Sequence, residues 1–152
     1  MRREYCGPTA IAAVTASSLD EVRSKIYQLR RRYHDVRRDG SDKPITGMDF
    51  HEINSVMEAL GWRVVGDQEY GSPSSHLTLR RFAKDFGDQG PFIADVGGHV
   101  VAISEGDLCD TKTVFPVPLK LALRLEEVRE YRIQKWCRYE RVLRRRAKAT
   151  RK

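Results

Sequence analysis

Apolar residues recur every three or four positions through much of the first half of the chain, which is the spacing of helices with one buried face. A first helix is predicted to begin at or just after Cys6, because Pro8 suits the first turn and the following residues are apolar on nearly all sides. Ser18 and Glu21 have the spacing of a capping box and predict an amphipathic helix to about Tyr33. The same spacing predicts two further helices, at residues 48–60 and 78–86.

The pattern then changes to short apolar runs separated by glycine turns, which is typical of antiparallel strands. The turns are expected at Gly97-Gly98 and at Glu105-Gly106. Strands are predicted at residues 62–65, 91–96, 99–104 and 107–110. Helices that precede an antiparallel sheet in this way indicate an α+β fold.

Prolines mark a boundary near residue 118. Beyond it, apolar residues fall roughly on one side of a single helix from residue 119 to about residue 148, with an interruption at Arg132. We therefore expect a domain of residues 1–118, in which helices pack on a small antiparallel sheet. A basic extension of residues 119–152 is expected to form one long C-terminal helix.

The chain has 152 residues, of which 40% are hydrophobic, as expected for one domain with one core. It has no apolar stretch long enough to span a bilayer and no apolar signal-peptide region at its start, so we expect a soluble cytoplasmic protein without a membrane partner. Its three cysteines are an odd number without zinc-ligand spacing. We therefore expect reduced thiols, one of them reactive, and neither a metal nor a cofactor.

The formal net charge of +7 is concentrated at one end of the chain. Residues 119–152 hold thirteen Lys and Arg against four Glu, which leaves fifteen basic and seventeen acidic residues in 1–118. The ordinary interpretation of such a run is a solvated helix face. The alternative is a contact surface for nucleic acid or an acidic protein partner. Its candidate residues are Arg138, Arg141, Arg144, Arg145, Arg146 and Lys148.

Cys6 is the candidate nucleophile. The thiolate is the reactive form of cysteine, and it is favoured where the amide groups and positive dipole of a helix N-terminus face it. The backbone N–H of Cys6 and that of Gly7 are candidate donors to the oxyanion that forms when a carbonyl is attacked. Gly7 also allows close approach of a substrate backbone, and Gly98 is expected to border the same cleft together with the loops at 34–47 and 66–76.

His99 is the candidate base, because it is the one histidine among four that opens a predicted strand. If Glu105-Gly106 forms a two-residue turn, Asp110 lies opposite Val101 across the hairpin. Val101 and His99 share a face of the strand, so that Asp110 becomes the diagonal neighbour of the imidazole and can orient it.

Other residues remain open as alternatives. Asp95 and Asp107 are alternative orienting acids, although Asp107 adjoins the turn and should be solvated. Cys109 points to the opposite face from Asp110 by the alternation of a strand, so it is predicted to belong to the core. Each proposed catalytic residue also has an ordinary structural interpretation, such as a buried core thiol for Cys6.

The runs CGPTAIAAV near the start and GHVVAISEGDLCDT downstream resemble papain-like cysteine peptidases, in particular the small bacteriocin-leader peptidases and related phage and bacterial proteins. The resemblance covers about residues 5–111 and implies a papain-like fold. It implies the roles of nucleophile for Cys6, base for His99 and orienting acid for Asp110. The family also places a glutamine several residues before the cysteine, and this chain has none there.

Two functions are therefore expected in outline. The first is a thiol hydrolase, a cysteine protease or amidase with a Cys-His-Asp catalytic triad acting on a peptide or protein substrate. The second is a catalytically silent binding protein that contacts nucleic acid or an acidic partner through the basic C-terminal extension.

Overall fold

The computed structural model describes residues 6–86, 89–110 and 117–142. Its α-helices are α1 (Cys6–Thr15), α2 (Leu19–Arg32), α3 (Phe50–Ala59), α4 (Leu79–Phe86), α5 (Leu119–Ala122) and α6 (Glu126–Arg129), with a short 3₁₀ turn at Pro73–Ser75. Its strands are β1 (Trp62–Glu69), β2 (Leu77–Thr78), β3 (Phe92–Asp95), β4 (Val100–Ser104), β5 (Asp107–Cys109), β6 (Val117–Pro118), β7 (Arg132–Ile133) and β8 (Lys135–Arg141).

The main sheet has the strand order β1-β8-β3-β4-β5-β6, and each neighbouring pair is antiparallel. The pair β2-β7 forms a small separate sheet. Strand β8 therefore lies between β1 and β3, although it follows both of them by many residues in the sequence. The arrangement confirms the expected α+β class.

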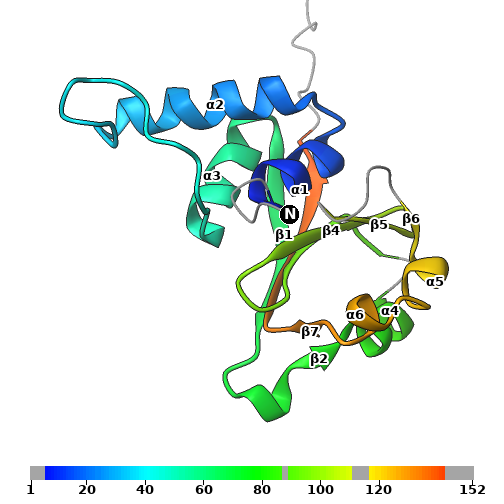
Figure 1. Cartoon of the computed structure of the whole chain (residues 1–152). Helices are drawn as coiled ribbons and strands as arrows, with labels where there is room; N and C mark the ends of the chain where they lie inside the picture. Colours follow the sequence, from blue (N-terminus) through cyan, green and yellow to red (C-terminus); the bar gives the residue numbers. More distant parts are fainter. Residues whose placement is uncertain (1–5, 87–88, 111–116, 143–152) are drawn as a thin grey trace, which may run out of the picture.

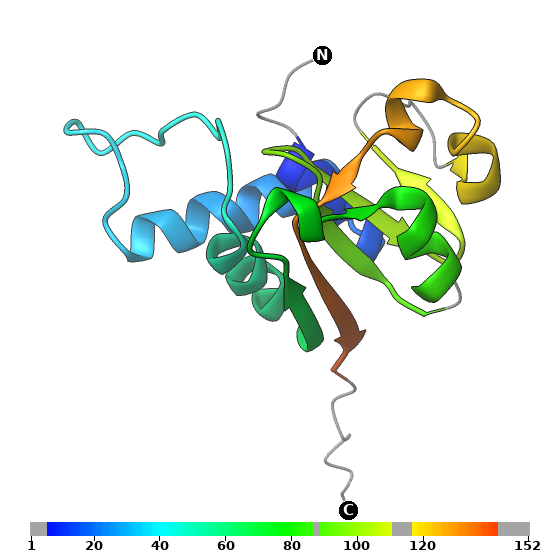
Figure 2. The ribbon, with the colours of Figure 1, turned by 90° about the horizontal axis from the view of Figure 1, so that it is seen from below.

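Helices cover both faces of the main sheet, so that the described residues form three layers (Figures 1 and 2). Helices α1, α2 and α3 share one apolar cluster with Ile93, whereas α4, α5 and α6 share a second cluster with Phe92 and Ala94. This division follows from the alternation of side chains along a strand, because Phe92 and Ala94 point to one face of β3 and Ile93 points to the other. Cys6 belongs to the first cluster.

Local signals account for the ends of the helices. Helix α2 begins with the predicted capping box, in which Glu21 N–H donates to Ser18 Oγ at 3.1 Å and Ser18 N–H donates to Glu21 Oε1 at 3.0 Å. Helix α3 is capped by Asp49, whose Oδ1 accepts from Glu52 N–H at 2.8 Å. In the part of the chain that the structure describes, the helices lack the combination of length and apolar character needed to cross a membrane.

The prediction of a long C-terminal helix is wrong. In place of such a helix, residues 119–142 form the four-residue helices α5 and α6 and the strands β7 and β8. The apolar spacing that suggested one helix comes from two patterns in succession. Leu119, Ala122 and Val128 are the buried residues of the two short helices. Cys137 and Tyr139 are then buried at alternate positions of a strand. Residues 143–148 of the predicted helix lie outside the described residues.

Candidate active site

Cys6 is the first residue of α1, and its side chain is almost fully buried. Helix α1 lies against β4 (Figure 1). The backbone N–H groups of Gly7 and Val100 both interact with its sulfur. These two donors come from different elements, the start of α1 and the start of β4, and a helix N-terminus adds the favourable end of its dipole. The environment is therefore one that stabilises a thiolate despite its burial.

His99 lies directly before β4 and is also buried, with 7% of its surface exposed. A turn held by Asp95 places it there. Asp95 Oδ1 accepts hydrogen bonds at 2.9 Å from the N–H groups of both Gly97 and Gly98. These glycines have φ angles of 103° and 80°, a left-handed conformation that a side chain would strain. Asp95, one of the alternative orienting acids, thus shapes the turn before His99.

The hairpin of β4 and β5 has the predicted register. Ser104 pairs with Asp107, Ile103 with Leu108 and Ala102 with Cys109, as a two-residue turn at Glu105-Gly106 requires. Asp110 directly follows β5, and the same register continued by one position places it across from Val101.

Asp110 contacts His99 directly. It is 3% exposed, and its Oδ1 lies 2.7 Å from His99 Nε2. The other ring nitrogen, Nδ1, is buried and makes no fully formed hydrogen bond to any group in the described ranges. The Cys6 thiol is nevertheless close enough to the ring to shift its pKa. Such contacts are often long before a substrate binds.

The electrostatic environment favours the ion pair over the neutral pair. Burial raises the pKa of Cys6, but the His99 imidazole and the N–H groups of Val100 and Gly7 outweigh burial and lower it below its usual value. The pKa of His99 is raised to about 9, first by its hydrogen bond to Asp110 and second by Cys6. Both shifts favour a thiolate beside an imidazolium over the neutral pair.

The two other cysteines have the opposite character. Burial raises the pKa of Cys109, and the nearby Asp107 carboxylate raises it further. Burial is also the main reason why the pKa of Cys137 is raised. Cys109 packs against the same apolar cluster as Cys6, as the strand alternation predicted. Among the three thiols, only Cys6 has an environment that promotes reactivity.

A cleft of about 420 Å³ lies beside Cys6. The loop before α3, residues 46–49, forms part of its lining, as does Gly98 of the glycine turn. Glu69 also lines it, but Glu69 ends β1 and does not lie in a loop as predicted. Lys135 also lines the cleft, where it lies 5.2 Å from the centre of the Phe50 ring and pairs with Glu69 at 3.6 Å. The N–H of Gly98 already donates to Asp95 Oδ1. Gly98 therefore lines the cleft without offering this N–H to a bound molecule.

Tyr131 belongs to the site but has no signal in the sequence pattern. Its hydroxyl donates to Asp110 Oδ2 at 2.7 Å, and its ring lies edge-on to the His99 ring with 6.1 Å between centroids. Burial, followed by the Asp110 carboxylate, raises the pKa of Tyr131, which keeps the hydroxyl protonated as a donor. His99 and Tyr131 thus bind different oxygens of Asp110.

Replacing Tyr131 with phenylalanine is expected to lower the free energy of unfolding by about 1–2 kcal/mol, because a buried carboxylate loses a hydrogen-bond donor. Urea denaturation near pH 7 measures this change. Tyr33→Phe is the matched control, since Tyr33 is 74% exposed. Equal unfolding curves for the two variants would show that the Tyr131 hydroxyl does not support Asp110.

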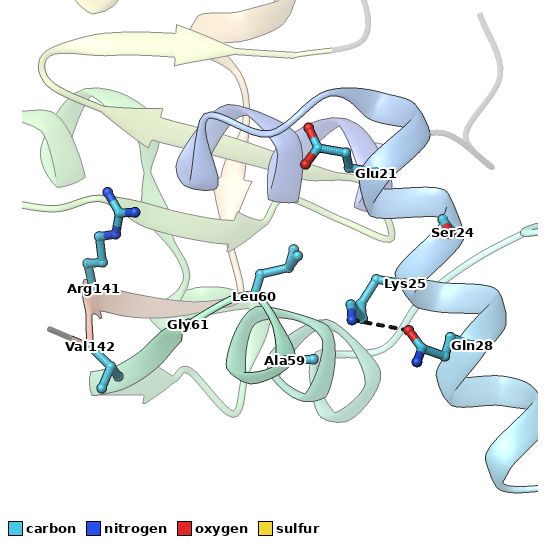
Figure 3. A pocket seen from close by; sticks show the side chains of 9 residues that line it. All are labelled: Glu21, Ser24, Lys25, Gln28, Ala59, Leu60, Gly61, Arg141 and Val142. Carbon is cyan, nitrogen blue, oxygen red and sulfur yellow. Dashed lines mark hydrogen bonds between the residues drawn. The ribbon is translucent and has the colours of Figure 1, made fainter. Parts of the chain in front are cut away.

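A second hollow, of about 740 Å³, lies away from Cys6 between α2, the end of α3 and the end of β8 (Figure 3). Lys25 points toward Gln28 there and donates to it at 3.1 Å, and Arg141 lies on the opposite side of the hollow. No cysteine or histidine lines this hollow. It offers no nucleophile comparable to Cys6.

Of the candidate basic contacts, the structure describes two. Arg138 is half-buried on β8 beside Gly66, and Arg141 is exposed at the end of the same strand. Arg144, Arg145, Arg146 and Lys148 lie outside the described residues. Within the described ranges, the acidic, histidine and cysteine side chains form no group of three or more that could hold a metal ion.

Comparison of the chain with protein-family models, with curated proteins and with solved structures found no match. The residues of the site and their geometry are therefore the basis for a functional conclusion.

Proposed function

We propose that the protein is a cysteine hydrolase that cleaves peptide or related amide bonds, with Cys6 as the nucleophile. The observation that supports this most strongly is the buried series Cys6, His99, Asp110, in which one ring nitrogen of His99 is bound to a carboxylate at 2.7 Å and the ring borders a thiol of lowered pKa. The sequence resemblance to papain-like peptidases points to the same chemistry.

In the first half of the proposed reaction, the Cys6 thiolate attacks the carbonyl carbon of a substrate bound in the cleft. The C–N bond then breaks, and the His99 imidazolium gives its proton to the leaving amine. Asp110 keeps the ring oriented and stabilises its positive charge without accepting the proton itself. The products of this step are a free amine and a thioester on Cys6.

In the second half, water attacks the thioester carbonyl while neutral His99 accepts a proton from the water. The carbon–sulfur bond breaks, which releases the carboxylic acid and restores the Cys6 thiolate and the His99 imidazolium. The backbone N–H of Cys6 is the candidate donor to the oxyanion in both halves.

The state of the ion pair determines the expected pH dependence. Activity should rise as the pH passes the lowered pKa of Cys6, because the thiolate forms there. It should fall as the pH passes about 9, because His99 then loses the proton that the leaving amine requires.

The direct test is cleavage of a mixed peptide library by the wild type and by Cys6→Ala near pH 7. Only the wild type is expected to produce new amino termini, and its acylated form should add the mass of a peptide fragment at Cys6. Cys109→Ala is the matched control and should retain cleavage, because the raised pKa of Cys109 keeps that thiol protonated. Cleavage by Cys6→Ala, or no cleavage by the wild type, would contradict the proposal.

A further inference from the structure

The loop between α2 and α3 approaches the nucleophile. Its residues 46–48, which we call the cleft wall, line the cleft beside Cys6. Met48 packs directly on Gly7, so closely that a Cβ atom at Gly7 would lie 2.8 Å from Met48 Sδ. The position of the cleft wall therefore determines the space on one side of Cys6.

Arg30 of α2 holds this loop from the inside. Its Nε and Nη2 donate to the two carboxylate oxygens of Glu52 on α3, at 2.7 and 3.0 Å. The same guanidinium reaches the backbone carbonyls of Pro44 and Gly47, both at 3.4 Å. One planar group thus connects two helices to the backbone of the cleft wall.

Arg30 differs from the charged residues around it. It is 9% exposed, although it belongs to a run of three arginines. Arg31 pairs with Asp42 on the same loop, but this pair is exposed and is expected to contribute little. A buried pair such as Arg30 with Glu52 adds little net stability over apolar residues of similar size. Its rigid fork of donors, however, determines geometry, which a flexible lysine does not do equally well.

We propose that Arg30 is a positioning residue for substrate binding, which acts through the carbonyls of Pro44 and Gly47 to place the cleft wall beside Cys6. This inference rests on the proposed hydrolase function, since the wall is argued to contact the peptide that Cys6 attacks. Arg30 touches neither the sulfur nor the imidazole in any contact described above. Its loss should therefore weaken binding of an extended peptide and leave the reactivity of the thiolate intact.

The experiment separates binding from reactivity with two probes. Iodoacetamide is small and reports on the thiolate alone, whereas acetyl-Leu-Ala-Gly chloromethyl ketone must bind along the cleft before it alkylates Cys6. Saturation kinetics with the second probe give a binding constant KI and a maximal rate kinact. Mass spectrometry of the labelled chain identifies the cysteine that reacts.

The test variant is Arg30→Met combined with Glu52→Leu, which removes both charges and leaves no unpaired, half-buried carboxylate. Its KI is expected to rise about tenfold, with kinact and the iodoacetamide rate within about twofold of the wild type. The KI of Arg30→Lys should lie between the KI of the wild type and that of the test variant, because an ammonium can pair with Glu52 but does not span both carbonyls. The exposed pair provides the control: Arg31→Met with Asp42→Leu should leave KI unchanged.

A cooperative thermal transition shows that the test variant is folded. An unchanged KI in the folded variant would overturn the role of Arg30. An equal loss of iodoacetamide and peptide reactivity would also overturn it, because Arg30 would then support the site as a whole. Failure of the hydrolase proposal has a different signature, in which wild-type Cys6 reacts with iodoacetamide no faster than Cys109.

Discussion

Replacing His99 with alanine is expected to slow the reaction of Cys6 with iodoacetamide roughly 30-fold near pH 6, because most of the thiolate is lost at that pH. The imidazole is the largest favourable influence on the thiol, through both a hydrogen bond and its charge. The N–H groups of Val100 and Gly7 remain in the variant, so part of the lowering of the Cys6 pKa should persist. The rate is measured against pH, with the labelled residue identified by mass spectrometry.

The midpoint of that pH profile should move to higher pH in His99→Ala. His51→Ala is the matched control, since His51 is an exposed histidine on α3. Its profile should coincide with that of the wild type. Equal rates for His99→Ala and the wild type near pH 6 would rule out the thiolate–imidazolium pair.

Replacing Asp110 with asparagine is expected to reduce peptide cleavage by at least about a hundredfold, because the imidazole loses the carboxylate that orients it and stabilises its charge. The hydrogen bond to Asp110 is the first cause of the raised His99 pKa. Without the carboxylate, the His99 pKa should fall below about 9. The alkaline side of the activity profile should therefore move to lower pH.

Asp107→Asn is the matched control for this change. Asp107 begins β5, the strand that Asp110 directly follows; it pairs with Ser104 in the hairpin register and has no described contact with His99. Its pH profile should match that of the wild type. If Asp110→Asn retained the wild-type alkaline limb near pH 9, Asp110 could not be the group that raises the His99 pKa.

Most helices and strands before residue 110 could be predicted from local signals, although β2 and the second half of β1 could not. Helix α2 has its capping box, and α3 and α4 each have one apolar face. The register that brings Asp110 to His99 depends only on a two-residue turn, which is a local property. The approach of Cys6 to this hairpin was inferred from residue types and family resemblance, since no local rule connects positions so far apart.

Strand β8 was missed for a physical reason. Near the start of β8, side chains on both faces pack in apolar clusters, so the alternation of the strand is visible only from Cys137 to Tyr139. Trp136 packs in the cluster on one face, whereas Cys137 and Tyr139 belong to the cluster on the other. With the leucines before it, this run matched helical spacing.

Tyr131 and Arg30 could not be found for related reasons. Tyr131 contacts Asp110 because the turn between α6 and β7 brings it there, whereas the apolar spacing of the sequence predicts one long helix over this segment. Arg30 lies in a run of three arginines, and no local pattern distinguishes it from its two neighbours. Its burial depends on Glu52, which lies on a different helix.

The position of β8 also has a consequence for biosynthesis. A ribosome makes Cys6, His99 and Asp110 well before it makes residues 135–141, yet those residues fill the gap between β1 and β3 and supply Lys135 to the cleft. A nascent chain that stops short of β8 has two strands with unpaired edges, which invite pairing with other chains. The cleft beside Cys6 is therefore completed only when β8 inserts between two strands that are translated before it.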